Sequence, residues 1–257
     1  MNESWEYYDD IAHSYDGQYE EPYWHLYHEI LHKLVSDSVH ADGKLLDLGT
    51  GTGRWAVHFA ALGFDVTALD PSKEMLSVLQ AKSRDHGVEI KLIDGRAECL
   101  PFDDRSFDYV TAMGDVISYT RNHERAISEV YRVLRERGRF LFTVDSAYAF
   151  LQDFLSHTEF GRAENFLLAD RHVTIGDMKM SRKSFKTYPF FPEELQSKLE
   201  STGFRVTDTA GMVVLGPYVN SRLASSLSEV AEWEYRFCRE SELLGRAEHL
   251  FFACEKG

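Results

Sequence analysis

The sequence predicts an α/β fold, with a mostly parallel sheet covered by helices on both faces. The first observation is the stretch from Leu45 to Trp55, in which an apolar strand, a glycine-rich turn and the start of an apolar helix follow one another. The second is the alternation of strand-like and helical segments from residue 44 to residue 145, a pattern typical of a parallel sheet. The third is the acidic residue that follows several strands, as at Asp70 and Asp145.

The glycine-rich turn carries Gly49, Gly51 and Gly53 at alternate positions. Glycine reaches positive φ and lets a ligand lie against bare backbone. The helix that begins directly afterwards offers free N–H groups to a carboxylate or a phosphate. The dinucleotide pattern G-x-G-x-x-G needs a glycine where this chain has Arg54, so the spacing argues against a bound dinucleotide. A βα turn that binds nothing is the alternative interpretation of this stretch alone.

The other elements follow from periodicity and from helix start and stop signals. We expect strands at 44–48, 64–69, 88–93, 107–112 and 139–144. Helices are expected at 28–39, from 54 to about 62, after Ser72 and at 124–134. Beyond residue 145 the pattern indicates a short helix at 150–155, a hairpin or antiparallel patch within 171–185, a helix at 193–200, a strand at 204–214, a mostly helical stretch at 221–244 and a strand at 249–254. We therefore expect one domain over 1–257.

Several acidic and glycine-containing segments fall where predicted strands end. Asp70 lies about twenty residues beyond the glycine turn, a position suited to accept hydrogen bonds from ribose hydroxyls. Its alternative role is turn chemistry before Pro71. Residues 94–98 and 113–115 follow the next two strands. Because the carboxyl ends of parallel strands share one edge of the sheet, these segments predict a ligand site beside the first strand.

Bulk composition limits the class of protein. With 44% hydrophobic and 27% charged residues, the 257-residue chain resembles an ordinary globular protein, and no run of 18 apolar residues is present. The first residues have neither a cationic stretch nor an apolar core, and the three cysteines lack metal or disulfide spacing, so we expect a cytoplasmic protein without a metal centre. The net charge of −14 and the absence of a basic block argue against nucleic acid as a partner.

Residues 1–28 are rich in aromatic and acidic side chains. We interpret them as short helices that pack on the domain. Two functions remain open for the rings: packing material with polar tips, or a lid over a ligand. A cationic ligand would gain about 0.5 to 2 kcal/mol from each well-placed ring.

With these features the chain resembles the class I S-adenosylmethionine-dependent methyltransferases, in particular the broad group of small-molecule enzymes. The resemblance is strong over 44–145 and moderate over 188–257. It rests on a set of short segments, each weak alone: residues 45–53, 68–72 with 75–76, 95–98, 100–103, 106–108, 129–134 with Gly138, 191–195 and 203–204. The resemblance implies a Rossmann-like three-layer sandwich, with a seven-stranded, mostly parallel sheet whose last strand is antiparallel. It also implies an enzyme that uses S-adenosyl-L-methionine and releases S-adenosyl-L-homocysteine.

Carried over residue by residue, the resemblance implies roles at the cofactor. The methionine part would lie on Asp47 and on the backbone of Gly49, Thr50 and Gly51, with Met113 and Gly114 beside the sulfonium. Asp70 would take the ribose hydroxyls. The adenine would lie near Pro71, Ser72, Met75, Gly95, Ala97 and Glu98. Arg96 departs from the acid that many relatives carry, which puts an adenine contact there in doubt, and Glu98 is the candidate replacement.

The acceptor and the chemistry at it are less defined. Candidate general bases are Asp115, Tyr119, Tyr15 and His123, with His172 as a further one, and no motif selects among them. We expect a small-molecule acceptor, partly apolar, under a cap formed by 1–40 and by the insert at 146–187. A methyltransferase of RNA or protein, a non-catalytic cofactor-binding protein and a nicotinamide dehydrogenase are the alternatives, the last disfavoured by the glycine spacing.

Overall fold

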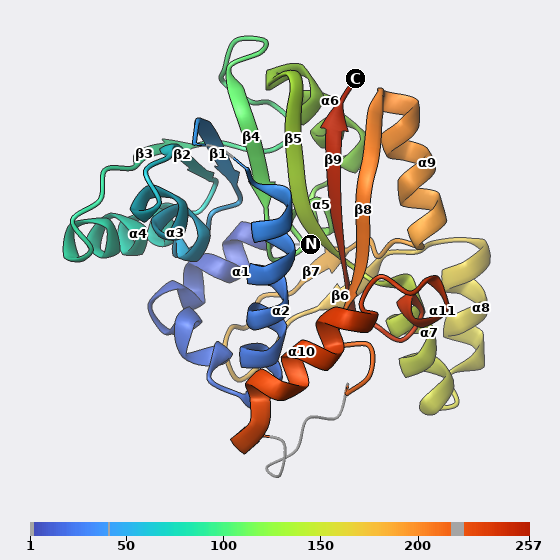
Figure 1. The fold of residues 1–257 in the computed structure, drawn as a ribbon. Helices are drawn as coiled ribbons and strands as arrows, with labels where there is room; N and C mark the ends of the chain where they lie inside the picture. The colour runs from blue at the N-terminus through green and yellow to red at the C-terminus, as the bar shows by residue number, and fades with distance from the viewer. Residues whose placement is uncertain (1–2, 41, 217–223) are drawn as a thin grey trace.

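A seven-stranded sheet in the order β3-β2-β1-β4-β5-β9-β8 forms the centre of the computed structural model, which describes residues 3–40, 42–216 and 224–257 (Figure 1). β9 runs antiparallel to both of its neighbours, β5 and β8, whereas the first five strands in the order pair in parallel. The predicted sheet, with its antiparallel last strand, is thus confirmed. The strands are β1 Lys44–Leu48, β2 Asp65–Asp70, β3 Lys91–Asp94, β4 Phe107–Ala112, β5 Leu134–Asp145, β8 Phe204–Met212 and β9 His249–Lys256.

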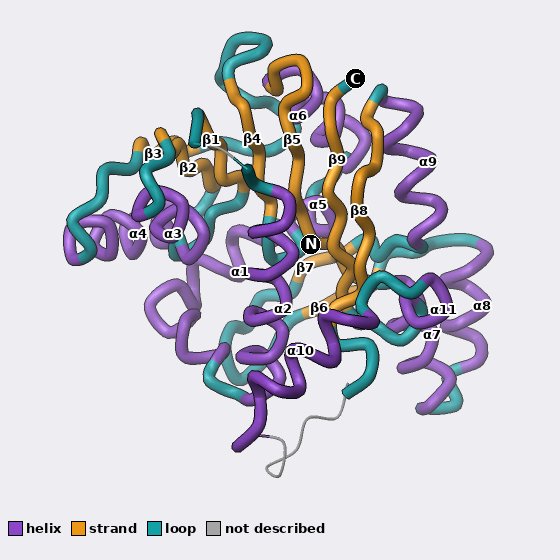
Figure 2. Tube along the Cα trace, in the orientation of Figure 1, coloured by secondary structure: helices purple, strands orange, loops and turns teal. Residues whose placement is uncertain are grey.

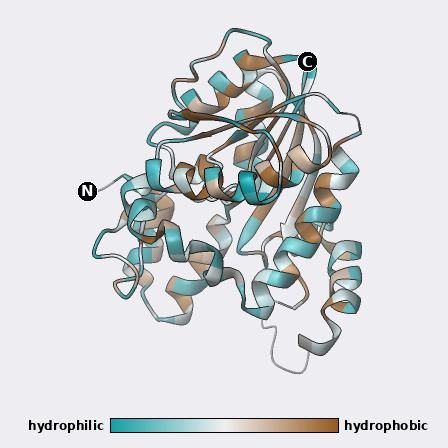
Figure 3. Ribbon diagram, turned by 90° about the vertical axis from the view of Figure 1, so that its left-hand side faces the viewer, coloured by the Kyte–Doolittle hydropathy of each residue, from teal (hydrophilic) through white to brown (hydrophobic). Residues whose placement is uncertain are grey.

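Alternation along the strands divides the core into two halves. In β5, Phe140 and Phe142 point into one hydrophobic cluster and Leu141 into the other, as expected from the two-residue period of a strand. All three side chains are fully buried. The apolar residues accordingly gather on the central strands and on the sides of the helices that face them (Figure 3).

Helices cover both faces of the sheet and complete the three layers (Figure 2). On the face of Phe140 lie α6 (His123–Val133) and α9 (Pro192–Thr202), which supply buried leucine, isoleucine and valine side chains. On the face of Leu141 lie α2 (Pro22–Ser38), α3 (Arg54–Ala61) and α10 (Leu227–Phe237). The helix α4 (Lys73–Asp85) follows β2 and contacts β2 and β3, and Ser72 caps it by accepting a hydrogen bond from the Met75 amide at 3.0 Å.

The carboxyl ends of the parallel strands are covered by segments from distant parts of the chain (Figure 1). The first is formed by α1 (Ser4–Ile11) and the 3-10 helix η1 (Ala12–Tyr19). The second follows β5 and comprises α7 (Ala147–Ser156), α8 (Phe160–Leu168) and the antiparallel pair of β6 (Val173–Ile175) with β7 (Phe185–Thr187). Short helices α5 (Val116–Tyr119), η2 (Ala224–Ser226) and α11 (Ser241–Leu244) complete the described elements.

Several elements differ from the sequence prediction: α2 begins at Pro22 and β3 at Lys91, and the larger differences lie in β5 and α8. The fifth strand begins at Leu134, which pairs with Phe107, and a register shift and a positive φ of 61° at Arg137 accommodate the irregular start. Helix α8 was not predicted, because Phe160, Leu167 and Leu168 are exposed and blur the apolar stripe. Of the helical stretch expected at 221–244, residues 221–223 lie outside the described residues. Within the described ranges, no helix combines the length and apolar character needed to cross a membrane.

Candidate active site

A cavity of about 390 Å³ opens at the carboxyl ends of β1, β2 and β4. Its wall combines the glycine-rich turn, the ends of the neighbouring strands, the N-terminal helices and the β6–β7 insert. Thirteen residues named from the sequence line it: Tyr15, Gly49, Thr50, Gly51, Asp70, Pro71, Met75, Ala97, Glu98, Met113, Gly114, Asp115 and Tyr119. The convergence of strand ends predicted from the sequence therefore forms one space.

Gly49, Gly51 and Gly53 all have positive φ, but they have different structural roles. A Cβ on Gly51 would meet nothing within 4 Å, so the backbone there faces open space in the cavity. A Cβ on Gly53 would lie 2.0 Å from Leu79 Cδ1 of α4. Gly53 thus provides the close packing that the dinucleotide pattern assigns to its third glycine, and the absence of glycine at position 54 is compensated.

Asp70 connects the glycine turn to the end of β2. Its Oδ2 accepts a hydrogen bond from the Gly51 amide at 2.8 Å, and its Oδ1 accepts one from the Ser72 amide at 2.8 Å. The side chain is buried, and this burial raises the pKa of Asp70 to about 6. Each carboxylate oxygen keeps a further lone pair, so Asp70 can still accept hydrogen bonds from a ligand in the cavity.

Three residues predicted to touch the cofactor do not line the cavity. Asp47 lies beneath the turn, where it accepts hydrogen bonds from the Thr50 hydroxyl at 2.6 Å and the Thr111 hydroxyl at 2.7 Å. Ser72 caps α4 and donates to Asp9 of α1 at 2.5 Å. Gly95 packs against Leu69. These side chains support the wall rather than form it.

The loop after β4 has a strained backbone that Thr143 holds in place. Gly114 and Asp115 have φ values of 82° and 63°, and a non-glycine residue in this region is uncommon. The amides of both residues donate to Thr143 Oγ1 of β5, at 3.0 and 3.1 Å. Asp115, one of the predicted bases, is thereby fixed in the cavity wall with only 4% of its surface exposed.

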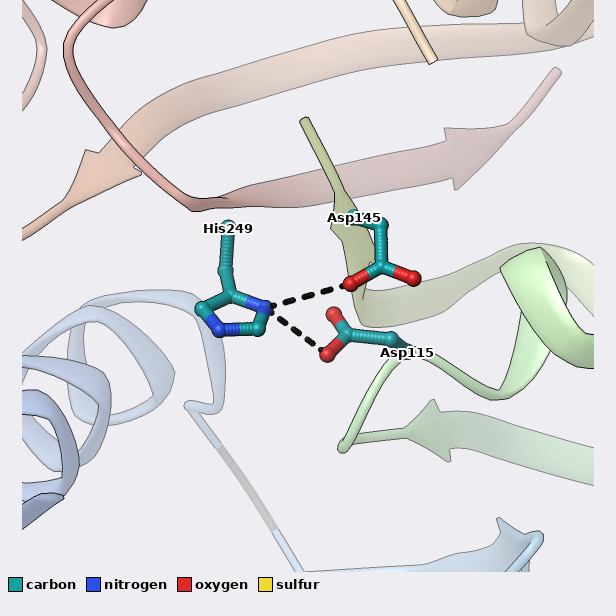
Figure 4. A group of neighbouring side chains, drawn as sticks. All are labelled: Asp115, Asp145 and His249. Atoms are coloured by element: carbon teal, nitrogen blue, oxygen red, sulfur yellow. Dashed lines mark ion pairs between the residues drawn. The ribbon is translucent and has the colours of Figure 1, made fainter. Parts of the chain in front are cut away.

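His249 completes a buried cluster that the sequence did not reveal. Its Nδ1 lies 2.8 Å from Asp115 Oδ2 and 3.7 Å from Asp145 Oδ1 (Figure 4). Asp145 also accepts a hydrogen bond from the Thr187 hydroxyl. We call Asp115, Asp145 and His249 the Asp-His-Asp cluster. A signal did exist: the first residue of an antiparallel last strand must lie at the carboxyl ends of the parallel strands.

The surroundings of the cluster shift the pKa values of His249 and Asp145. Burial alone would lower the pKa of His249, but the adjacent carboxylates of Asp115 and Asp145 raise it to about 9. Burial, followed by the charge of Asp115, raises the pKa of Asp145 to about 7. At neutral pH the imidazole is therefore a cation between two carboxyl groups.

Aromatic side chains surround this end of the cavity. Tyr8 and Tyr119 contact each other and the β7 residue Phe185, with ring centroids 5.1 to 6.2 Å apart. Trp24 and Tyr27 lie against the His249 ring at 5.8 and 5.4 Å. Burial and the nearby carboxylates hold the pKa of Tyr8, Tyr27 and Tyr119 well above the usual value, so these phenols stay neutral.

The two other candidate histidines lie elsewhere. His123 packs on Tyr188 and Phe190, with ring centroids 4.6 and 5.1 Å apart, and does not line the cavity. His172 pairs with Asp170 and packs on Tyr188, also outside the cavity wall. The geometry does not support their prediction as bases, because neither side chain reaches the shared space.

Comparison with known proteins decides the family. Residues 45–138 match the family model described as "Methyltransferase domain". A demethylmenaquinone methyltransferase of Thermus thermophilus is 30% identical over 65% of this chain and 76% of its own length. The chain belongs to the class I S-adenosylmethionine-dependent methyltransferases.

One further relative and one solved structure match most of the chain. The uncharacterized protein MJ1252 of Methanocaldococcus jannaschii is 29% identical over 80% of this chain and 78% of its own. The crystal structure of an S-adenosylmethionine-dependent methyltransferase from Clostridium acetobutylicum has a TM-score of 0.64 at 17% identity, covering 97% of this chain and 99% of that one. The latter likeness concerns the fold.

The residues of this methyltransferase fit its cofactor, S-adenosyl-L-methionine. Open backbone at Gly51 leaves room for a ligand against the turn, and the buried carboxylate of Asp70 retains acceptor capacity for hydroxyl groups. Pro71 and Met75 supply apolar wall on the same side. Arg96 pairs with Glu3 at 3.3 Å and lies over the Trp5 ring.

Proposed function

We propose that this methyltransferase transfers a methyl group to a small-molecule acceptor held in the cavity beside Asp115. The observation that carries the proposal is the continuity of the space: the glycine turn and Asp70 line the same cavity as Asp115 and Tyr119. A cofactor at one end and an acceptor at the other can therefore meet without a large surface for a macromolecule. The relative named demethylmenaquinone methyltransferase supports a small acceptor.

The proposal includes a cap made of residues 1–40 and the insert at 146–187. Their contacts with each other support it: Asp10 of α1 accepts hydrogen bonds from the Ser181 hydroxyl at 2.6 Å and from Lys183 Nζ at 2.8 Å. Lys183 also donates to the Glu6 carbonyl at 2.9 Å. Tyr7, Tyr8 and Phe185 bring rings from both segments to the cavity wall.

At the cofactor end we assign the ribose hydroxyls to Asp70, the methionine part to the backbone of Gly49 to Gly51, and the adenine to the wall formed by Pro71, Met75 and Ala97. The bound cofactor supplies an electrophilic methyl group on sulfur. The protein then has to hold the acceptor in line with that group and exclude water, and such positioning supplies roughly 7 to 11 kcal/mol of catalysis. Asp115, Tyr119 and Tyr15 are the polar groups placed to orient the acceptor or take its proton.

Two measurements test the proposal. Calorimetry with S-adenosylhomocysteine is expected to show one site per chain, and Asp70→Ala is expected to weaken it strongly. Incubation with methyl-labelled S-adenosylmethionine and cell extract, separated into a low-molecular-weight filtrate, RNA and protein, is expected to label the filtrate. Label confined to RNA or protein would overturn the small-molecule acceptor while leaving the cofactor site intact.

A further inference from the structure

This inference rests on the proposed function and concerns the chemical class of the acceptor. Its first observation is an unpaired atom. Asp115 is 4% exposed, and its Oδ1 has no hydrogen-bond partner among the residues that the structure describes, while Oδ2 faces His249. Asp115 is among the residues that line the cavity, so its carboxylate lies close to a ligand bound there. A buried carboxylate oxygen without a partner is costly, so a ligand that donates to it gains affinity.

The second observation is the charge of the cavity floor. One imidazolium, His249, stands against the carboxyl groups of Asp115 and Asp145, and the neighbouring Glu248 adds a further negative charge that acts on His249. A carboxylate or phosphate acceptor would meet repulsion there. The bound cofactor already carries a positive sulfur, so a second cation can approach only where an anion compensates it.

The third observation is the surrounding aromatic wall. Tyr8 packs against Tyr15 and Tyr119 with ring centroids 5.8 and 6.2 Å apart, and Trp24 packs against Tyr27 at 5.5 Å. All five side chains line the cavity. The faces of such rings attract cations, each by about 0.5 to 2 kcal/mol. Rings and a buried carboxylate together favour a positive, organic ligand over a neutral one.

We propose that the methyl acceptor is a small organic amine that binds as its ammonium ion between Asp115 and the tyrosine rings of the cavity wall. Asp115 Oδ1 accepts a hydrogen bond from the ammonium group, and the rings contact its carbon substituents. His249 is a positioning residue that fixes the orientation of the Asp115 carboxylate.

The reaction balances with groups already present. The ammonium ion transfers one proton to the Asp115 carboxylate, and the nitrogen lone pair then forms a bond to the methyl carbon. The carbon–sulfur bond breaks, and its electron pair stays on sulfur in S-adenosylhomocysteine. The product is the methylated ammonium ion, and the proton on Asp115 passes to solvent. No oxidant, reductant or metal is required.

A matched pair of probes tests the charge preference by binding alone. Choline cannot be methylated further at nitrogen, and 3,3-dimethylbutan-1-ol is its neutral analogue of the same shape. With protein saturated by S-adenosylhomocysteine, calorimetry is expected to show choline binding about tenfold or more tighter than the alcohol. Equal binding of the two probes, or tighter binding of the alcohol, would overturn the proposal.

Variants locate the preference. Asp115→Asn is expected to weaken choline binding about 10- to 100-fold, because the negative charge that attracts the quaternary ammonium group is lost, and to leave S-adenosylhomocysteine affinity within about twofold. Glu89→Gln removes one negative charge from an exposed site outside the cavity and serves as the matched control. If Asp115→Asn does not fold, which the loss of S-adenosylhomocysteine binding would reveal, Tyr119→Leu replaces it and is expected to lower choline affinity but not that of the alcohol.

Two other outcomes would identify a different role. In the labelling experiment, the methylated product is expected to be retained on a cation exchanger at neutral pH. A neutral or anionic labelled product would contradict the amine proposal and leave the small-molecule function intact.

The ligand atoms of the Asp-His-Asp cluster lie within 4.8 Å of one another, so Mg²⁺ and Mn²⁺ are also titrated alone. Tight metal binding abolished by Asp115→Asn would assign the cluster to a metal ion instead.

Discussion

His249 and Asp145 lie opposite each other in the register of β9 and β5. The first residue of the last strand therefore stands beside the last residue of the fifth, at the edge of the sheet where the cavity opens. Since Asp115 follows β4, the neighbour of β5, three strand ends bring two carboxyl groups and one imidazole together. The antiparallel direction of β9 is what places a histidine at this edge.

The first prediction concerns the pH dependence of stability. His249 has a pKa raised from 6.5 to about 9, so between these values the folded protein keeps a proton that the unfolded chain loses. The contribution of His249 to the unfolding free energy should therefore be full below pH 6.5 and fall as pH rises towards 9, by roughly 1 to 3 kcal/mol. Urea unfolding measured between pH 6.5 and 9 should show a clearly smaller decline of the unfolding free energy with pH in His249→Gln than in the wild type.

Exposed His86 supplies the control for this experiment. His86→Gln should retain the full decline between pH 6.5 and 9. An identical pH slope in wild type and His249→Gln would show that the imidazole gains no stabilisation from Asp115 and Asp145.

The second prediction concerns cofactor affinity and Asp70. Because burial raises the pKa of Asp70 to about 6, lowering the pH through 6 should protonate the carboxylate and weaken S-adenosylhomocysteine, approaching tenfold per pH unit. Above pH 7 the affinity should be constant. Asp70→Asn should bind about tenfold or more weakly at pH 7.5 and should lose most of the pH dependence. Calorimetry from pH 5 to 8 measures both effects.

Asp94 ends the adjacent strand β3, pairs with Asp70 in register and does not line the cavity. Asp94→Asn should bind S-adenosylhomocysteine as wild type does, with the same pH profile. If Asp94→Asn and Asp70→Asn behaved alike, the carboxylate of Asp70 would have no special role at the cofactor.

The third prediction concerns the packing of the glycine turn against α5. A Cβ on Gly49 would lie 2.5 Å from Val116 Cγ2, at a residue with a φ of 64°. Gly49→Ala should therefore lower the unfolding free energy by about 1 to 3 kcal/mol and displace the start of α5. Thermal unfolding measures the loss.

The double variant Gly49→Ala with Val116→Ala removes the clashing methyl groups and keeps the backbone strain. It should recover part of the stability that Gly49→Ala loses, so that the two substitutions are not additive. Strict additivity would contradict the proposed contact between the glycine turn and α5.

The fourth prediction concerns the cap. Asp10→Ala removes the acceptor of both the Ser181 hydroxyl and Lys183 Nζ, so α1 and the insert should separate more often. Hydrogen exchange should become faster at the amides of β6 and β7, with little change in the central strands. Asp85→Ala, on exposed surface at the end of α4, is the control and should leave exchange in the insert unchanged. Unaltered exchange after Asp10→Ala would show that the insert is held by its apolar contacts alone.

Local sequence signals were sufficient for the sheet and for most of the cavity wall. Strands β1 and β4 were placed at the bounds the structure shows, because each is an apolar run between clear turn residues. The glycine turn and the strand-end segment around Asp70 were found for the same reason: a parallel sheet fixes which ends of its strands share an edge.

What the sequence could not supply depended on side-chain direction and on distant pairing. Asp47 and Ser72 belong to the right segments but turn their side chains toward Thr111 and α1, respectively. His249 escaped notice because its partners, Asp115 and Asp145, lie far from it in the sequence, and only the β5–β9 register and the end of β4 bring them together. His123 was named by chain position alone, and packing against Tyr188 takes it elsewhere.

The proposed cap joins two segments that lie about 170 residues apart in the chain and hold each other through Asp10, Ser181 and Lys183. The N-terminal segment also contacts the cofactor side of the cavity, because the Thr52 hydroxyl of the glycine turn donates to Asp16 of η1 at 2.7 Å. Substitutions that reshape the contact between the two segments should therefore arise in pairs, one in each segment, and preserve the bond between Asp16 and the glycine turn. The range of acceptors of such an enzyme can change by coupled substitutions in the two cap segments, without changes in the central sheet.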